Sequence, residues 1–323
     1  MKDNQTRIGI ITSGGDAPGM NAVIRAVVRS AAHFEMRAYG IHAGFDGLFK
    51  NEIDEIHPDD VTGIIHRGGT ILRTARCDEM MTEEGQAHAA EICKVMKFET
   101  VIVIGGDGSF RGAESLSRHG INVVGIPATI DLDMECTEYT IGFDTAVNTV
   151  ANAIVRLRDT SSSHDRCSVV EVMGRNAGHL ALWCGLASGA DEVLIPEHPI
   201  DIKEVEEQIL NERAKGKNHH LIVVAEGIGG SDKIAKELER ALGIESRATI
   251  LGHLQRGGMP TAIDRMHASV MGFMAVEAAK NKNANKIVIF RNGKHELISL
   301  EEAFAAKREY NHKLYQITKI LAI

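Results

Sequence analysis

Residues 8–34 read IGIITSGGDAPGMNAVIRAVVRSAAHF, and this stretch decides the fold class. Its apolar run at 8–12 predicts a buried strand, the glycine-rich residues 13–19 predict a turn, and a helix is expected from about Asn21 to Phe34. Similar apolar runs recur at 101–104, 123–126, 168–172, 221–225 and 286–290. Buried strands that alternate with helices predict an α/β protein with mainly parallel sheets.

The composition narrows the class of protein. A chain of 323 residues is long enough for two domains or one large α/β unit. A formal net charge of −8 and an aromatic content of 4% argue against nucleic-acid binding. The five widely spaced cysteines give neither a disulfide framework nor a zinc signature. Because neither a signal peptide nor a membrane-spanning run is visible, we expect a cytoplasmic protein that binds no membrane.

Two glycine-rich turns follow predicted strands. Gly14 and Gly15 lie in the first, and glycines there let the backbone approach a phosphate while the next helix points its N–H groups at it. The second turn carries Asp107, a carboxylate suited to a Mg²⁺ shared with nucleotide phosphates, although an aspartate that caps the next helix is an alternative. Neither turn matches a P-loop or the dinucleotide fingerprint, which argues against a dehydrogenase.

Carboxylates and arginines supply the remaining chemistry. Asp131 and Asp133 lie two residues apart at the end of a predicted strand, where they can point the same way and serve as a base and its support. The alternative is a pair of turn aspartates. Several arginines lie beside glycines and suit a phosphorylated substrate. These groups together predict a phosphoryl-transfer enzyme.

The motifs resemble those of the bacterial-type ATP-dependent 6-phosphofructokinases. The matching segments follow the family order over nearly the whole chain: 14–21, 68–70, 74–76, 105–109, 129–131 with Asp133, 158–164, 173–175 and 251–258. The resemblance implies transfer of the γ-phosphoryl group of ATP to the C1 hydroxyl of fructose 6-phosphate, with Mg²⁺.

The resemblance also implies a role for each matching residue. The catalytic set is Gly15, Thr129, Asp131 (the base), Asp133 and Arg175. The nucleotide set is Gly14, Gly15, Arg76, Cys77, Gly105, Gly106, Asp107 (also the metal ligand), Gly108 and Ser109. The sugar-phosphate set is Thr129, Asp131, Arg166, Met173, Gly174, Arg175, Glu226, Arg247, His253 and Arg256, with Arg166 and Arg247 contributed by a neighbouring subunit.

A phosphofructokinase fold has two Rossmann-like three-layer domains. The resemblance places a larger nucleotide-binding domain at 1–140 plus 252–305 and a smaller fructose 6-phosphate domain at 141–251 plus 306–323. It implies a homotetramer with an effector site for ADP or phosphoenolpyruvate, formed by Arg25, Arg29, Arg158, Asp191, Lys215 and Lys217. Because Pro58 replaces an arginine that usually contacts effector phosphate, we expect weakened or altered control.

The chain departs from the family in several positions. Gly108 and Ala128 lack the Asp and Lys typical of pyrophosphate users, which favours ATP, although the ATP group usually has glycine at the position of Ala128. Leu132 stands where the family usually has asparagine, Cys77 and Met81 replace an aromatic residue and an arginine near the nucleotide, and Arg111 is unusual there. A pyrophosphate-dependent or tagatose 6-phosphate-accepting relative, or a catalytically weak sugar-phosphate sensor, are the alternatives.

Overall fold

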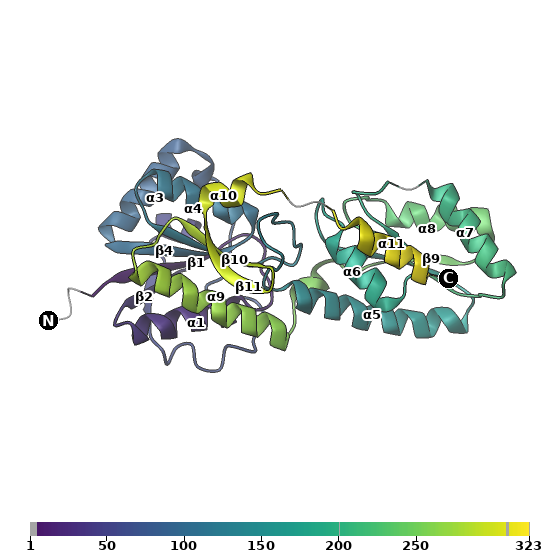
Figure 1. The fold of residues 1–323 in the computed structure, drawn as a ribbon, viewed down its shortest axis with the longest axis horizontal. Helices are drawn as coiled ribbons and strands as arrows, with labels where there is room; N and C mark the ends of the chain where they lie inside the picture. The colour runs from purple at the N-terminus through teal and green to yellow at the C-terminus, as the bar shows by residue number, and fades with distance from the viewer. Residues whose placement is uncertain (1–4, 200, 308–309, 323) are drawn as a thin grey trace. The chain divides into compact units, whose positions relative to one another are not determined.

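The computed structural model describes residues 5–199, 201–307 and 310–322, and its secondary structure alternates strands and helices along the chain (Figure 1). Two compact units make up the chain. Unit 1 comprises Met1–Thr129, Met134–Thr145 and Arg256–Arg308, and unit 2 comprises Ile130–Asp133, Ala146–Gln255 and Glu309–Ile323. Each unit is built around its own sheet.

The sheet of unit 1 has seven strands. Their order is β11 (Lys294–Ser299), β10 (Lys286–Arg291), β5 (Val123–Pro127), β4 (Phe98–Gly105), β1 (Arg7–Thr12), β2 (Arg37–Ile41) and β3 (Ile53–Ile56). The inner five strands run parallel, whereas β3 and β11 pair antiparallel at the two edges. Both faces of the parallel strands are covered, which explains why these runs are apolar throughout rather than alternating.

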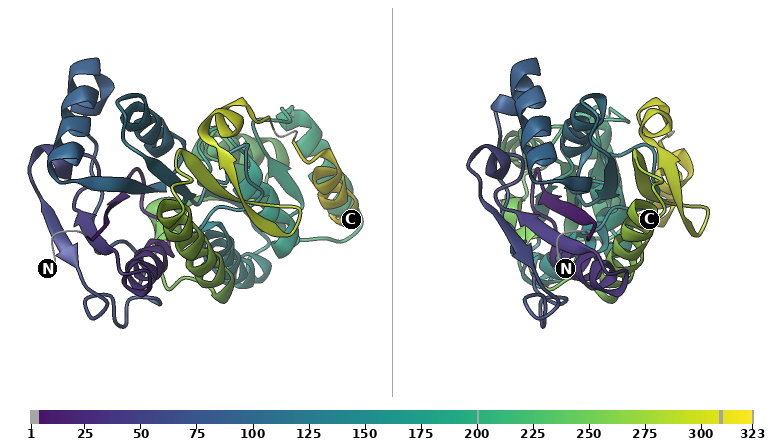
Figure 2. Two further views of the ribbon diagram at one scale, coloured as in Figure 1. Left: turned by 60° about the vertical axis from the view of Figure 1, so that its left-hand side comes forward. Right: turned by 90° about the vertical axis from the view of Figure 1, so that its left-hand side faces the viewer.

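Helices form a layer on each face of this sheet. The helices α1 (Met20–His33) and α9 (Ala262–Lys280) pack together on one face, while α3 (Glu83–Val95) and α4 (Asp107–Arg118) lie on the other (Figures 1 and 2). The short elements of the unit are α2 (Asp46–Phe49), α10 (Leu300–Ala305) and the 3₁₀ turn at Glu79–Met81. The core beneath α3 and α4 includes Val101, Val103, Phe110 and Leu116.

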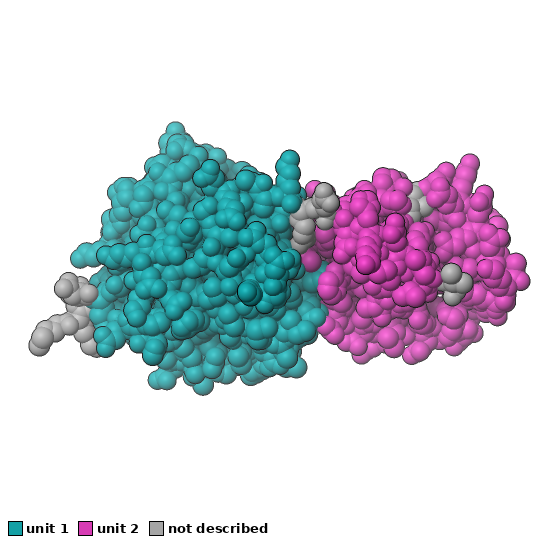
Figure 3. All heavy atoms as spheres, viewed as in Figure 1, with its two compact units in different colours: residues 1–129, 134–145, 256–308 teal, residues 130–133, 146–255, 309–323 magenta. Residues whose placement is uncertain are grey.

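Unit 2 is smaller and has a fully parallel sheet (Figure 3, magenta). Its strand order is β7 (Glu192–Leu194), β8 (His220–Ala225), β6 (Cys167–Val172) and β9 (Ser246–Ile250). Two of its helices, α6 (His179–Ser188) and α11 (His312–Leu321), pack together. Two others, α7 (Ile202–Ala214) and α8 (Ser231–Leu242), cover a shared core. Most of α5 (Phe143–Ser163) also belongs to this unit. A 3₁₀ turn spans Gly252–Arg256.

The predicted α/β class with mainly parallel sheets is confirmed. The first helix occupies Met20–His33, within one residue of the prediction. The helix after the second glycine-rich turn begins at Asp107, because the amides of Ser109 and Phe110 donate to the carbonyl of Gly106. Among the described residues, no helix combines the length and apolar character needed to cross a membrane.

Candidate active site

The two glycine-rich turns of unit 1 lie side by side at the carboxyl ends of β1 and β4. These strands are paired in parallel, and the Ser13 amide donates to the carbonyl of Ile104 at 3.0 Å. Gly14 has a left-handed φ of 82°, and a Cβ built on Gly105 would lie 2.5 Å from the Ser13 carbonyl oxygen. Only glycine allows this approach of one turn to the other. Ser109 is buried beneath both turns.

Arg256 lies against the first of these turns. A side chain at Gly15 would overlap the Arg256 guanidinium, which donates a hydrogen bond to the Asp16 carbonyl at 3.1 Å. The resemblance assigns Arg256 to the sugar phosphate together with His253, which is exposed. The structure thus places a cation within reach of the glycine turn itself.

Asp107 is the first residue of α4, where its carboxylate faces solvent. Its Oδ2 accepts from Arg111 Nε at 2.9 Å, and the two side chains are 46% and 67% exposed. No side-chain cap bond forms at this helix start, so the capping alternative is not what the structure shows. A single exposed carboxylate beside a helix N-terminus fits a magnesium ion shared with nucleotide phosphates, because magnesium takes one or two protein carboxylates and completes its shell elsewhere. A Cβ built on the adjacent Gly108 would meet no atom within 4 Å.

Residues 76–81 also belong to unit 1, and the resemblance assigns two of them, Arg76 and Cys77, to the nucleotide. Arg76 is exposed, and Met81 is 83% exposed. The Cys77 thiol donates to Glu79 Oε2 at 3.6 Å, and burial raises the pKa of Cys77. The Cys77 thiol therefore replaces the usual aromatic residue without gaining the reactivity of a thiolate.

Thr129 is the last residue of the first segment of unit 1. Strand β5 stops at Pro127, the Ala128 amide donates to the Gly105 carbonyl at 2.9 Å, and the Thr129 carbonyl accepts from Thr140 Oγ1 at 2.7 Å. These bonds hold the end of β5 next to the second glycine turn.

Asp131 and Asp133 belong to unit 2, where both contact Arg175. The Arg175 Nε atom lies 3.3 Å from Asp131 Oδ2, and Arg175 Nη1 lies 3.6 Å from Asp133 Oδ2. The Asp131 side chain is 1% exposed and that of Asp133 is 19% exposed. The prediction that the carboxylates point the same way agrees with these contacts, but the reason given for it, strand alternation, is wrong. The strand has already ended, and Leu132 between them has a left-handed φ of 53°.

This φ also accounts for the residue usually found at position 132. Asparagine tolerates the left-handed region because its short side chain can bond locally, whereas leucine there costs roughly 1–2 kcal/mol. Leu132 is buried at 5% exposure, so burial of its side chain offsets part of that cost.

Arg175 itself sits on a strained turn that Glu226 holds. Gly174 has φ 134° and Arg175 has φ 53°. The Glu226 Oε1 atom accepts from both backbone amides, at 3.1 Å from Gly174 and 2.6 Å from Arg175. The Met173 amide donates to Gln255 Oε1 at 3.1 Å. Glu226 and Gln255 thus fix the backbone that aims the guanidinium.

Arg166 and Arg247, expected to serve a neighbouring subunit, meet at one carboxylate within unit 2. Glu245 accepts from Arg166 Nε at 2.6 Å and lies 2.7 Å from Arg247 Nη2. Hydrogen bonds from Arg247 and Arg166 lower the pKa of Glu245. The carboxylate therefore sets the spacing of the two guanidinium groups.

The predicted effector residues fall into one group on each unit. Arg25 and Arg29 share a face of α1, and burial together with the charge of Arg29 lowers the pKa of Arg25. In unit 2, Lys217 pairs with Asp191, and Lys215 and Lys217 line one pocket. The sixth residue, Arg158, donates to the Gly189 carbonyl at 2.8 Å.

Sequence patterns gave no role to Gln255, Glu245, Arg111 or Asp264. Asp264 is fully buried and accepts from the amides of Gly142 at 2.7 Å and Thr145 at 2.9 Å, which anchors the start of α5 just after the aspartates. These partners lie about 120 residues away in sequence, so no local pattern could reveal them. Only the four-residue spacing of Asp107 and Arg111 is a readable signal.

Comparisons with known proteins identify the family of this chain. The family profile of phosphofructokinase matches residues 7–279. An ATP-dependent 6-phosphofructokinase of Clostridium botulinum strain Hall is 51% identical over 315 residues, covering 98% of this chain and 99% of the relative. That of Clostridium tetani is 52% identical over 316 residues, with the same coverage.

Solved structures share the fold. Phosphofructokinase from Saccharomyces cerevisiae superposes with a TM-score of 0.86 at 33% identity, over 93% of this chain and 45% of that chain, so this chain spans less than half of the yeast chain. A pyrophosphate-dependent phosphofructokinase from Marinobacter aquaeolei gives a TM-score of 0.84 at 21% identity, over 97% of this chain and 91% of that chain, a likeness of fold alone. The predicted fold is thus confirmed, and the chain belongs to the phosphofructokinase family.

Proposed function

We propose that this protein is a glycolytic kinase that transfers the γ-phosphoryl group of ATP to the C1 hydroxyl of fructose 6-phosphate. The products are fructose 1,6-bisphosphate and ADP. The observation that carries the proposal is the buried Asp131 carboxylate, held 3.3 Å from Arg175 Nε. The relatives that are 51% and 52% identical over nearly the whole chain support ATP as the donor.

In the proposed reaction Asp131 is the general base. As the C1 oxygen attacks the γ-phosphorus, its proton passes to the Asp131 carboxylate, and the bond from the γ-phosphorus to the β–γ bridging oxygen breaks so that ADP leaves with the electron pair. Arg175 stabilises charge on the transferring group, which an oriented guanidinium does well because it reorganises little during the reaction. Thr129 and Asp133 support the base and the arginine.

The nucleotide set acts by positioning. The turns of Gly14, Gly15 and residues 105–109 offer backbone amides to the phosphates, with Arg76 as a further cation and Cys77 beside the adenine ring of the nucleotide. Asp107 holds Mg²⁺, which when bound neutralises charge on the nucleotide phosphates. Arg111 shares the same carboxylate and competes with the metal for it.

The remaining assignments are part of the same proposal. Fructose 6-phosphate binds through Met173, Gly174, Glu226, His253 and Arg256, with Arg166 and Arg247 contributed across subunits of a homotetramer. The two domains have the bounds predicted from the resemblance, 1–140 plus 252–305 and 141–251 plus 306–323. We place the enzyme in the cytoplasm. ADP and phosphoenolpyruvate act at the six predicted effector residues with altered strength, because Pro58 lacks the usual arginine's charge.

The test is a coupled assay of fructose 1,6-bisphosphate formation with ATP, GTP and pyrophosphate as separate donors. Tagatose 6-phosphate replaces the sugar in a parallel series. Asp131→Asn removes the base but keeps the shape of the side chain, and we expect kcat to fall by about 10²–10⁴-fold. Asp133→Asn, which touches the same arginine, is the matched control and is expected to lose less.

Each alternative has its own result in this assay. Turnover with pyrophosphate alone overturns the choice of donor, and faster turnover of tagatose 6-phosphate overturns the choice of sugar. No turnover with any donor, from protein that still binds sugar phosphate, favours the sensor.

A further inference from the structure

A buried cluster of ionisable groups lies in unit 2, apart from the aspartates of the proposed reaction. Asp191 directly precedes β7, Glu212 lies in the last turn of α7, and His220 is the first residue of β8. All three are buried, and their ligand atoms lie within 4.8 Å of one another. Three adjacent elements thus bring two carboxylates and one imidazole to a single point.

The Lys217 ammonium occupies the centre of this cluster. It pairs with Asp191 Oδ1, lies 2.9 Å from Glu212 Oε2 and donates to the Ala322 carbonyl at 3.3 Å. The second oxygen of Asp191 accepts from the Leu221 amide at 2.6 Å. Two buried carboxylates therefore share one cation, which leaves the cluster with one negative charge in excess when His220 is neutral.

Ion pairing with Lys217 explains why the two carboxylates are buried, but it does not explain the burial of the His220 ring. Its side chain is 0% exposed, and neither ring nitrogen makes a hydrogen bond to any residue that the structure describes. Its Nδ1 points into the cluster, 3.3 Å from Glu212 Oε2 and 4.0 Å from Asp191 Oδ2. Burial lowers the pKa of His220, which favours the neutral imidazole with its lone pair. A buried imidazole with no hydrogen-bond partner is costly unless something binds it.

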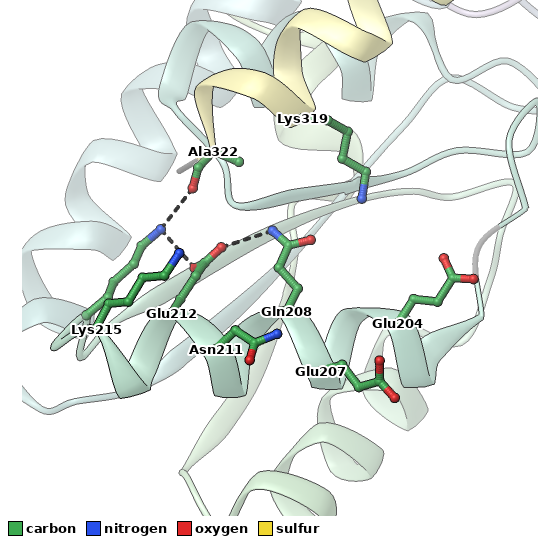
Figure 4. Close-up of a pocket in the computed structure, with 9 residues that line it drawn as sticks. Glu204, Glu207, Gln208, Asn211, Glu212, Lys215, Lys319 and Ala322 are labelled. Atoms are coloured by element: carbon green, nitrogen blue, oxygen red, sulfur yellow. Dashed lines mark hydrogen bonds and ion pairs between the residues drawn. The ribbon is translucent and has the colours of Figure 1, made fainter.

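The cluster opens onto a pocket of about 490 Å³. Glu212, Gln208 and Lys215 point into this pocket from α7 and the loop after it, and Lys319 and Ala322 close it from the C-terminal segment (Figure 4). Lys217 is 29% exposed, so its long side chain can withdraw from the cluster into the pocket. An ion can then reach the carboxylates from solvent.

We propose that Asp191, Glu212 and His220 form a binding site for a divalent transition-metal ion, which competes with the Lys217 ammonium for the same position. Two carboxylate oxygens and one neutral imidazole nitrogen suit zinc and its neighbours, whereas magnesium and calcium prefer oxygen ligands alone. An ion of charge +2 balances the two carboxylates fully, which one ammonium cannot. The site shares Asp191 and Lys217 with the proposed effector residues, and it adds Glu212 and His220, which have no part in that role.

The test is isothermal titration of the full-length protein with ZnCl₂ after chelator treatment, without nucleotide or sugar. Absorption of Co²⁺ is the second readout, because oxygen and imidazole ligands give d–d bands without a thiolate charge-transfer band. His220→Gln is expected to weaken Zn²⁺ binding by about tenfold or more. The neighbouring His219→Gln is the matched control and should bind like the wild type.

Lys217→Met gives the opposite and more telling result. Removing the competing ammonium leaves two buried carboxylates without their cation, so Zn²⁺ affinity is expected to rise by about tenfold or more. This variant decides the matter even where His220→Gln fails to fold, which circular dichroism will show. Unchanged Zn²⁺ affinity in Lys217→Met overturns the proposal.

A second metal-binding possibility needs a control. Asp46, Cys77 and Glu79 in unit 1 also bring ligand atoms within 4.8 Å. Cys77→Ser should leave the Co²⁺ spectrum and the Zn²⁺ affinity unchanged. A thiolate band in the wild type that Cys77→Ser abolishes, with no other bound metal, assigns the binding to unit 1 and overturns the proposal. None of these readouts depends on kinase activity, so they stand apart from the test of the proposed function.

Discussion

Removing the Glu226 carboxylate should lower kcat, because this side chain holds the turn that carries Arg175. Glu226 Oε1 accepts two backbone amides, at 3.1 Å and 2.6 Å. A hydrogen bond to a charged group contributes about 1.5–3 kcal/mol, and the low end of this range applies because Glu226 is only half-buried. The two bonds together therefore contribute about 3 kcal/mol. Against this, the left-handed conformation of Arg175, with φ 53°, costs about 1–2 kcal/mol.

The balance between these terms gives the size of the effect. With Glu226 the observed turn is favoured by about 1–2 kcal/mol, and in Glu226→Ala it is disfavoured by a similar amount. The fraction of enzyme with Arg175 beside Asp131 then falls, and kcat should drop by about 5- to 30-fold. Glu226→Gln keeps an acceptor oxygen without the charge, so its loss should be intermediate.

The matched control is Glu197→Ala. Glu197 Oε1 accepts the Gly178 amide at 2.8 Å in the same loop, but Gly178 has an ordinary φ of −88°, so this bond holds no left-handed residue. Steady-state kinetics over a range of fructose 6-phosphate concentrations separate the roles. A rise in KM for the sugar with kcat unchanged would refute the positioning role, because it would mean that Glu226 acts by touching the substrate alone.

Three further results are expected. Gly108→Asp should fold normally, since nothing lies within 4 Å of the added Cβ. Its negative charge should raise the KM for ATP by about tenfold, whereas the control Gly108→Ala should change the KM less. Equal KM values in the two variants would contradict this. Arg111→Gln should lower the Mg²⁺ concentration for half-maximal activity by about twofold, because the exposed i,i+4 ion pair between Arg111 and Asp107 is worth about 0.3–0.5 kcal/mol. A rise in that Mg²⁺ concentration would count against competition between Arg111 and the metal for Asp107. Burial and the nearby His295 lower the pKa of His267 in the folded protein to about 4. In the unfolded protein this histidine keeps its ordinary pKa near 6.5 and therefore binds a proton at higher pH. The free energy of unfolding that the neutral His267 contributes is thus fully present above pH 6.5 and is lost as the pH falls toward 4. Thermal unfolding of His267→Asn should show a flatter pH dependence than the wild type over that range.

The sequence predicted those features that local patterns determine. The strand and helix of residues 7–33 follow from an apolar run, a glycine turn and a helical period, and the structure has them within one residue. The glycine turns meet because β1 and β4 are parallel neighbours, so their carboxyl ends fall at one edge of the sheet.

Other features depend on backbone conformation or on distant partners. No rule of alternation predicts that Leu132 takes a φ of 53°, yet this is what lets both neighbouring aspartates face one arginine. The hydrogen bonds of Glu226 and Gln255 span 51 and 82 residues, and a propensity scale does not see them. The role of Arg111 was within reach, because a spacing of four on a helix places it over Asp107.

Three of the arginines that these proposals assign to phosphate binding already pair with carboxylates. Arg175 pairs with Asp131 and Asp133, and Arg166 and Arg247 share Glu245. In a chain of net charge −8, such pairing keeps these three guanidinium groups oriented and makes them less available to non-specific anions. A phosphate gains affinity only where it can share the guanidinium or bring a cation that compensates the carboxylate. A phosphorylated sugar or a magnesium-bound nucleotide meets that condition, and a polyanion such as nucleic acid does not, so the same pairs that weaken binding also select the substrate.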